Sequence, residues 1–167
     1  KLAKDSGRWT TANDISILDV GTAKPDLLID EQQIVHAVWE TSNEGGGSYG
    51  AVSKPVYISY ARSLDGGASW LEPIKFNSVQ EESRNPAIAQ DRNEQILVVW
   101  SGLPEDQIYY RISSSGGEDW SASSIIPGIS GGWSVYNTML DSSNMAVDSD
   151  GIVHLVLVGR LAGLEDR

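Results

Sequence analysis

The sequence predicts an all-β chain built from repeated four-stranded antiparallel units. Three observations predict this fold class. Short apolar runs of strand length alternate with clusters of Gly, Asn, Asp and Ser; pairs of such strands recur around an Asp; and a Ser-Gly-Trp turn pattern recurs in step with them. The 17 glycines and 6 tryptophans among 167 residues fit strands joined by tight turns.

The recurring strand pair occupies three segments of fifteen residues each. In every segment an apolar strand runs up to an Asp, a polar turn follows, and a second apolar strand returns. The segments are residues 25–39, 86–100 and 143–157, with Asp30, Asp91 and Asp148 at the turns. His36 and His154 occupy the same position of the second strand, and we expect both to be packed scaffold residues rather than metal ligands.

The turn pattern advances in register with the strand pair. It reads SLDGGASW at residues 63–70 and SSSGGEDW at residues 113–120, and a shortened copy ends at Trp9. Trp9 and Trp70 are 61 residues apart, and so are Pro25 and Pro86. Two independent markers with the same step indicate a structural repeat.

Each repeat therefore holds four short strands: one before the Asp, one after it, one before the Ser-Gly-Trp turn and one after that turn. A four-stranded antiparallel unit that recurs in this way is typical of a β-propeller blade, whose apolar faces are buried only against neighbouring blades. We expect the outer strand of a preceding blade in 1–17, complete blades in 18–79 and 80–138, and the first half of a further blade in 139–167.

This division amounts to about two and three-quarter blades, whereas propellers close with about 4–8. We therefore expect a partial β-propeller that belongs to a ring of about six to eight blades. The chain is then a fragment, a cleaved product, or a subunit that completes its ring with blades of another chain, including identical copies.

The turn at residues 63–70 matches the pattern Ser-x-Asp-x-Gly-x-x-Trp, which is called an Asp box. In it we expect Asp65 to accept backbone hydrogen bonds of its own turn, Gly67 to adopt a positive φ, and Trp70 to fill the space between neighbouring strands. We interpret Asp65 as a structural residue rather than a catalytic acid. The structural residues of the two boxes are Ser63, Asp65, Gly67 and Trp70, then Ser113, Gly117 and Trp120, with Ser115 in place of the second Asp.

Through these motifs the chain resembles the BNR-repeat (Asp-box), sialidase-like or neuraminidase superfamily of β-propellers. The resemblance implies an extracellular, cell-surface or periplasmic location, and Asp boxes on the face opposite the active site. It also implies a catalytic set of three arginines, a Tyr–Glu pair and an Asp. The first family arginine lies in a Phe/Tyr-Arg-Ile-Pro motif, whereas Arg111 is followed by Ile112 and Ser113. The chain has no recognisable arginine triad, so no catalytic residue is assigned.

Two insertions relative to the repeat, near residues 42–52 and 128–137, are expected on the face opposite the boxes. Insertions confined to one face of a repeat array often mark its binding face. Glu40 is expected on the same face. The candidate ligand-binding residues of this face are Arg84, Trp133, Tyr136, Asn137, Tyr49 and Glu105.

Two alternatives stay open for the strongest of these candidates. Arg84 precedes an innermost strand, where it either contacts an anion or a sugar hydroxyl or pairs with Glu81 or Glu82. Trp133 and Tyr136, on a Gly-rich loop, either stack on a sugar ring or pack over the edge of a blade.

The net charge of −11, with no basic patch, argues against nucleic acid as a partner. No apolar run approaches the ~20 residues of a membrane span. The absence of cysteine excludes disulfides and zinc-thiolate sites. The turn at Asp148 lacks the spacing of a calcium loop, and we expect neither a metal nor a cofactor.

Two functions of different classes fit these observations. The first is a non-catalytic propeller scaffold that binds a carbohydrate or a protein. The alternative is a sialidase-like glycoside hydrolase whose catalytic residues lie mostly in other blades. A fold of this kind supports both, so the decision rests on the site.

Overall fold

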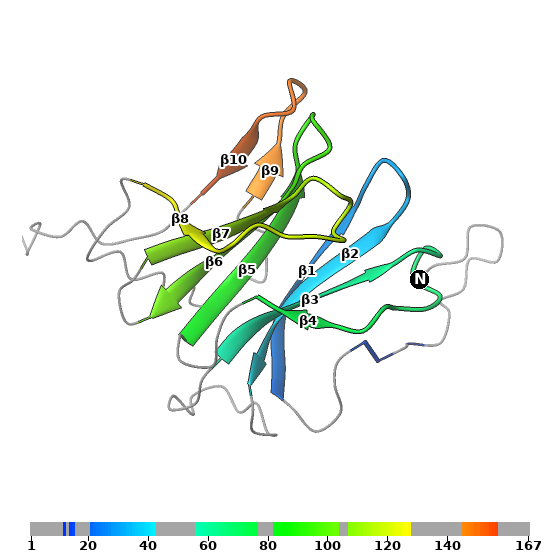
Figure 1. Cartoon of the computed structure of the whole chain (residues 1–167), viewed down its shortest axis with the longest axis horizontal. Coiled ribbons are helices and arrows are strands. Elements are labelled where there is room, and N and C mark those ends of the chain that lie inside the picture. Colours follow the sequence, from blue (N-terminus) through cyan, green and yellow to red (C-terminus); the bar gives the residue numbers. More distant parts are fainter. Residues whose placement is uncertain are drawn as a thin grey trace, which may run out of the picture.

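The computed structural model describes residues 12, 14–15, 21–42, 56–76, 82–103, 107–127 and 145–156 (Figure 1). These residues form ten β-strands and contain no helix. The prediction of an all-β chain with four-stranded antiparallel sheets is therefore confirmed. Within the same residues, no helix has the length and apolar character needed to cross a membrane.

The strands form three sheets in chain order, and hydrogen-bonded neighbours are antiparallel. Sheet one contains β1 (Gly21–Ile29), β2 (Val35–Ser42), β3 (Val56–Ser63) and β4 (Ile74–Lys75). Sheet two contains β5 (Glu82–Gln90), β6 (Ile96–Leu103), β7 (Gln107–Ser113) and β8 (Ser124–Ile125). Sheet three contains β9 (Met145–Val147) and β10 (Val153–Leu155).

The first turn of every sheet has the same geometry. The backbone N–H of the turn Asp donates to the carbonyl oxygen four residues later, and the N–H of that later residue donates to the Asp carboxylate. The residue three positions after the Asp has a positive φ, which is 65° at Gln33, 61° at Glu94 and 74° at Gly151. The recurring Asp thus closes the turn. The position three residues after it favours glycine, because any other residue there has a strained backbone.

Replacing Gln33 with glycine is expected to raise the free energy of unfolding by about 0.5–1 kcal/mol, because the Cβ strain of a left-handed residue disappears. Denaturant unfolding of the variant and the parent measures the change. Glu31→Gly is the matched control, since Glu31 lies in the same turn without a positive φ and glycine there is expected to destabilise. A loss of stability in Gln33→Gly would contradict the strain.

The first strands of sheets one and two, β1 and β5, each carry a bulge at the same place. The register slips by one residue at Lys24 and Pro25 in β1 and at Asn85 and Pro86 in β5. Both Lys24 and Asn85 have a φ of 52°. Because proline cannot donate a ladder hydrogen bond, a bulge is the place in a strand where it fits. The bulge changes the direction of the backbone at the start of β1 and β5, at the sheet end opposite the first turns.

The sheets stack face to face in chain order, with β5 packed against sheet one and β9 packed against β5 (Figure 1). We call the face of a sheet that is turned towards the next sheet its forward face, and the other its backward face. The first junction joins the forward residues Leu28, Val38, Ile58 and Tyr60 to the backward residues Ile88, Ile96, Val98 and Trp100. The second joins the forward residues Ala87, Ala89, Val99 and Ile108 to the backward residues Met145, Val153 and Leu155.

The tryptophans of both Ser-Gly-Trp turns pack on the backward face of their own sheet, and Trp120 thereby lies between sheets one and two. Trp120 packs edge-on against Tyr60, at 4.9 Å between ring centroids, and against Phe76 at 4.7 Å. Trp70 packs with Ile15 against the backward face of sheet one, beside Trp39. Each turn therefore contributes one large aromatic side chain to the packing on the backward face of its sheet.

Candidate functional site

A polar cluster surrounds Arg84 at the start of β5, at the sheet end opposite the Ser-Gly-Trp turns. The guanidinium donates to the carboxylate of Glu82 through Nε, at 3.0 Å, and through Nη2. Its Nη1 lies 3.5 Å from Oε2 of Glu40, a side chain of sheet one. The second oxygen of Glu40 accepts the backbone N–H of Asn85, in the bulge, at 2.7 Å.

This cluster joins the two sheets at one end. The carboxylate of Glu40 is almost fully buried, while Arg84 and Glu82 are partly exposed. Two carboxylates around one guanidinium leave the cluster with a net negative charge, so an anionic ligand has little attraction to it. Carboxylate acceptors and the remaining N–H donors of Arg84 suit a ligand rich in hydroxyl groups.

The cluster shows the partners of Arg84, for which the sequence left two alternatives open. Arg84 pairs with Glu82, as one alternative stated, and additionally with Glu40, which no local pattern indicated. Glu81 lies outside the described residues. So do the other candidate ligand-binding residues, namely Tyr49, Glu105, Trp133, Tyr136 and Asn137.

The turn at residues 63–70 is held by the carboxylate of Asp65. Its Oδ1 accepts the backbone N–H groups of Ala68 and Ser69 at 2.9 and 2.8 Å, and the hydroxyl of Ser63 at 2.8 Å. The hydroxyl and backbone hydrogen bonds from Ser69, with that from Ser63, hold the pKa of Asp65 well below its ordinary value. A carboxyl group that is held in its ionised form is a poor proton donor, which agrees with a structural role for Asp65.

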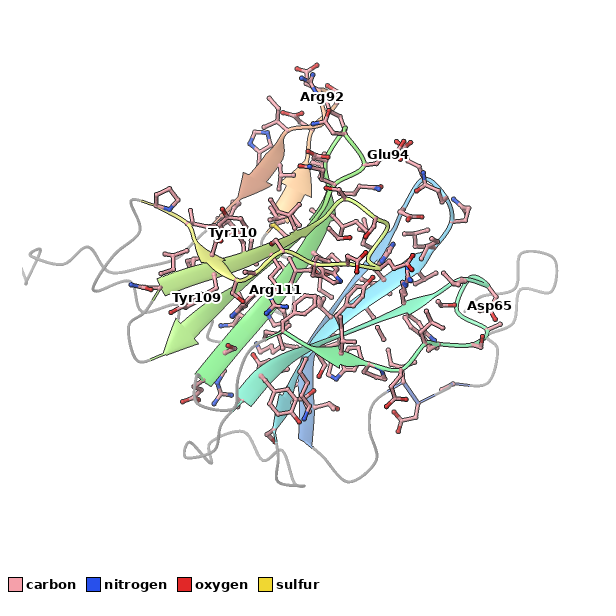
Figure 2. All side chains as sticks on the ribbon, in the orientation of Figure 1. Asp65, Arg92, Glu94, Tyr109, Tyr110 and Arg111 are labelled. Atoms are coloured by element: carbon pink, nitrogen blue, oxygen red, sulfur yellow. The ribbon has the colours of Figure 1, made fainter. Side chains whose placement is uncertain are left out.

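The turn at residues 113–120 repeats this arrangement with fewer bonds. Ser115 Oγ accepts the N–H of Asp119 at 2.8 Å, where Asp65 accepts two backbone N–H groups. Ser113 Oγ accepts the N–H of Gly117 at 2.9 Å, as Ser63 accepts that of Gly67 at 2.7 Å. The serine thus keeps the turn but not the full hydrogen-bond set. Figure 2 shows Asp65 at the turn end of sheet one, and Arg92 and Glu94 at the turn end of sheet two.

Arg111, the residue nearest to the family arginine motif, is partly buried beside Phe76. It lies on β7, with its guanidinium 5.2 Å from the ring centroid of Phe76 and its Nε donating to Ser123 at 3.0 Å (Figure 2). A cation over an aromatic face in a junction between sheets stabilises packing. Arg111 is therefore a strand residue of the scaffold.

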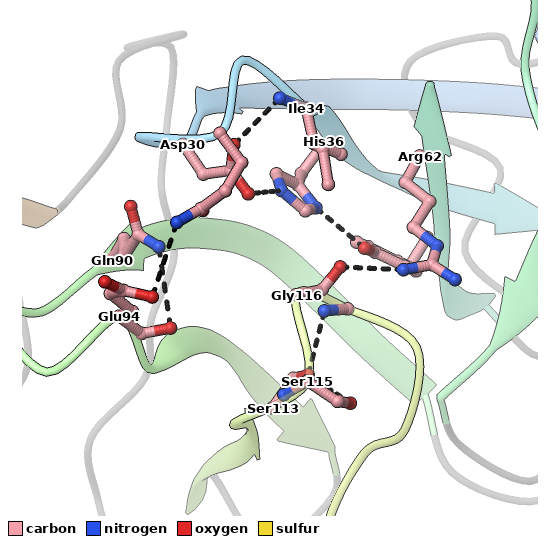
Figure 3. Close-up of polar contacts among 12 residues, drawn as sticks. Asp30, Ile34, His36, Arg62, Gln90, Glu94, Ser113, Ser115 and Gly116 are labelled. Atoms are coloured by element: carbon pink, nitrogen blue, oxygen red, sulfur yellow. Dashed lines mark hydrogen bonds and ion pairs between the residues drawn. The ribbon is translucent and has the colours of Figure 1, made fainter. Parts of the chain in front are cut away.

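A buried chain of three side chains links the first turn of sheet one to the junction (Figure 3). His36 Nε2 lies 3.1 Å from Oδ2 of Asp30, and Nδ1 lies 2.8 Å from the hydroxyl of Tyr60. Since the carboxylate only accepts, the neutral ring donates from Nε2 and accepts the Tyr60 proton at Nδ1. Nearby, Arg62 donates to the carbonyl oxygen of Gly116 at 2.9 Å. Asp30, His36 and Tyr60 are closed to solvent, while the partly buried Arg62 joins sheet one to the turn of sheet two.

Acidification is expected to destabilise the chain through His36. Burial lowers the pKa of His36, more than the hydrogen bond and charge of Asp30 raise it, and the charge of Arg62 lowers it further. In the unfolded chain the pKa of a histidine is about 6.5, so below that pH the unfolded state binds a proton that His36 does not bind in the folded state. The contribution of neutral His36 to the free energy of unfolding is therefore complete above that pH and is lost as the pH falls below it. Urea unfolding at a series of pH values measures the slope.

His36→Gln is expected to flatten this pH dependence. His154 makes the equivalent bond, with Nε2 2.7 Å from Oδ2 of Asp148, but it is exposed. The expectation that both histidines are packed is therefore wrong for His154. The reason is that Tyr60 and Gly117 cover His36, while His154 lies on the forward face of sheet three, which no described sheet covers. An equal slope in His36→Gln would contradict the assignment.

Metal ligation has no support in the described part of the chain, where no three His, Asp or Glu side chains are grouped to hold an ion. A shallow cavity of about 490 Å³ lies between the first turns of sheets two and three, lined by Arg92, Asp91, Asp148 and Asp150 among others. The carboxylates of Asp91 and Asp148 are already used by their own turns. The cavity is therefore a gap between two turns.

No family model matches the chain, and no curated protein matches it. A solved structure described as "Hadza microbial sialidase Hz136" is similar at 20% sequence identity over 61% of this chain, with a TM-score of 0.48. The match spans 24% of that sialidase chain, so the matched part of this chain corresponds to about a quarter of its length.

Proposed function

We propose that this chain is part of a non-catalytic β-propeller scaffold that binds a hydroxyl-rich partner, a carbohydrate or a polar protein surface, at the sheet ends around Arg84. The observation that carries the proposal is the Arg84 cluster itself. It brings a partly exposed guanidinium and carboxylates from two sheets together at the start of an inner strand. Such a cluster offers donors and acceptors side by side, which is what hydroxyl recognition needs.

The propeller part of the proposal rests on the equivalence of the sheets. Sheets one and two share strand order, bulge position and turn geometry, and they stack forward face on backward face. Ile15, six residues after Trp9, packs on sheet one as Phe76, six residues after Trp70, packs on sheet two. Residues 1–17, 18–79, 80–138 and 139–167 then correspond to an outer strand, two blades and a partial blade.

The Ser-Gly-Trp turns are proposed as Asp boxes on the face that does not bind. An extracellular, cell-surface or periplasmic location accompanies this proposal through the resemblance to BNR-repeat proteins. The contacts of Asp65 and Ser115 within their own turns support a purely structural role for the boxes.

Glycan-array binding followed by titration calorimetry tests the proposal. Arg84→Ala is expected to weaken binding by about tenfold or more, which corresponds to about 1.4 kcal/mol. Arg92→Ala is the matched control, because Arg92 is an exposed arginine on the turn at the other end of sheet two. Equal affinities of Arg84→Ala and the parent for every glycan bound would overturn the site.

The alternative is a sialidase-like glycoside hydrolase, favoured by the full Asp-box sequence at residues 63–70. Turnover of a fluorogenic sialoside distinguishes it from the scaffold. Hydrolysis that Arg84→Ala abolishes would replace the binding role with catalysis at the same face. Absence of both turnover and glycan binding would leave a protein surface as the partner.

A further inference from the structure

The charged residues around Arg84 are not a shared feature of sheets one and two. Equivalent positions of these sheets lie 61 residues apart in the sequence, and the bulges of β1 and β5 keep this step. The pairs of equivalent residues are Ala23 and Arg84, Gly21 and Glu82, and Glu40 and Ser101. Because β1 forms the same bulge with two uncharged residues, the bulge of β5 does not require the charges of Arg84 and Glu82.

The contacts of Arg84 leave part of its guanidinium for a ligand. Nε and Nη2 both donate to Oε1 of Glu82, and Nη1 lies 3.5 Å from Oε2 of Glu40. Each terminal nitrogen carries two N–H groups, so one on Nη1 and one on Nη2 remain beyond these contacts. The Arg84 side chain is 32% exposed and that of Glu82 is 24% exposed. A ligand that reaches Arg84 therefore also meets the Glu82 carboxylate.

The two carboxylates of the cluster differ in what holds them. Glu40 is 7% exposed, and its Oε1 accepts the backbone N–H of Asn85 at 2.7 Å. Within the described part of the chain, the carboxylate of Glu82 contacts Arg84 alone. Glu40 is thus a fixed part of the junction between the sheets, whereas Glu82 is the carboxylate that faces a ligand.

The charge of the cluster distinguishes between classes of sugar. Two carboxylates and one guanidinium have one net negative charge. A carboxylate of a ligand that bound Arg84 would lie close to the carboxylate of Glu82, and like charges in a partly buried site repel. A sugar hydroxyl can accept from the same N–H groups of Arg84 and donate to Glu82, without a charge of its own.

We propose that Glu82 makes the Arg84 site selective for uncharged sugars over acidic ones, including sugars that end in sialic acid. This selectivity rests on the proposed function and names both the ligand class and the residue that determines it. Glu82 acts by repelling the unwanted ligand, which is a general way in which a binding site discriminates between two similar molecules.

A glycan array of matched pairs tests the selectivity, where each pair is a neutral glycan and the same glycan with a terminal sialic acid. The parent chain is expected to bind the neutral member about tenfold more tightly. Glu82→Gln keeps the size of the side chain and removes its charge. Its affinity for the sialylated member is therefore expected to rise about tenfold, while its affinity for the neutral member stays within about threefold.

Glu94→Gln is the matched control for a general change of net charge. Glu94 is exposed in the first turn of sheet two, at the other end of the sheet, and its substitution removes the same charge from the chain. This variant is expected to keep the preference of the parent. Circular dichroism checks that both variants keep the sheet content of the parent.

A second measurement does not need a glycan that binds tightly. The NMR signal of the Nε–H group of Arg84 is followed while N-acetylneuraminic acid is added. The signal is expected to shift in Glu82→Gln and to stay in place in the parent and in Glu94→Gln. A shift in the parent, or no shift in Glu82→Gln, would overturn the selectivity.

The selectivity and the proposed function fail in different ways. If the parent binds both members of each pair equally and Arg84→Ala weakens both, the binding site stands and the role of Glu82 is wrong. If the parent binds no glycan, the proposed function is wrong. The NMR titration then decides by itself whether Glu82 excludes an acidic sugar from Arg84.

Discussion

Gly117→Ala is expected to lower the free energy of unfolding by about 3 kcal/mol or more, because two effects act together. Gly117 has a φ of 77°, which a side chain tolerates poorly. Its new methyl group would also collide with the Tyr60 hydroxyl, which is hydrogen-bonded to His36 in the buried chain. The side chains of Tyr60 and His36 have little room to move, since both are buried in the first junction.

Gly116→Ala is the matched control for this prediction. Gly116 has a φ of 62°, but a methyl group there would meet nothing within 4 Å. Its cost is therefore the backbone strain alone, about 1–2 kcal/mol. Denaturant unfolding of both variants gives the difference, which measures the collision.

A double-mutant cycle identifies the partner of the collision. Tyr60→Phe removes the hydroxyl that the new methyl group meets, so Gly117→Ala is expected to cost less in that background than in the parent. Two results would contradict the close contact of Gly117 with Tyr60. One is an equal loss in free energy of unfolding for Gly116→Ala and Gly117→Ala, and the other is additive effects of Gly117→Ala and Tyr60→Phe.

The arrangement of strands could be predicted from the sequence because it depends on spacing. Trp9 and Trp70 repeat with the same step as Pro25 and Pro86, so the order of strands within a repeat follows from one copy to the next. The pairing of Arg84 with Glu82 could be predicted for a similar reason, since the two residues are neighbours on one strand. Patterns over a few residues of sequence thus predict contacts between residues that are close together in the chain.

Contacts between sheets could not be predicted in this way. Glu40 and Asn85 are 45 residues apart, and their hydrogen bond exists only because the bulge of β5 turns its N–H towards sheet one. The sequence signal for the bulge is weak: a proline follows Lys24 and Asn85, and the same prolines mark the repeat. The different surroundings of Gly67 and Gly117 had no sequence signal, because they depend on which sheets lie next to them.

Trp100→Ala is expected to lower the free energy of unfolding by about 3–5 kcal/mol, the cost of removing a large aromatic side chain from a packed core. Trp100 is fully buried between sheets one and two. Its ring stacks on Tyr109 of its own sheet and lies 6.1 Å from the ring centroid of Phe76, which follows sheet one. The indole N–H has no hydrogen-bond partner among the described residues.

Trp100→Phe is consequently expected to cost only about 1–2 kcal/mol, since it keeps an aromatic ring and loses no hydrogen bond. Because Trp100 fills the junction and not the interior of one sheet, its removal should weaken both sheets together. Hydrogen exchange measures this: in Trp100→Ala, the amides of Val38 in sheet one and Val98 in sheet two are expected to lose protection by the same factor. Loss of protection confined to Val98 would mean that each sheet is stable without its neighbour, and the stacked junction would not be the core of the fold.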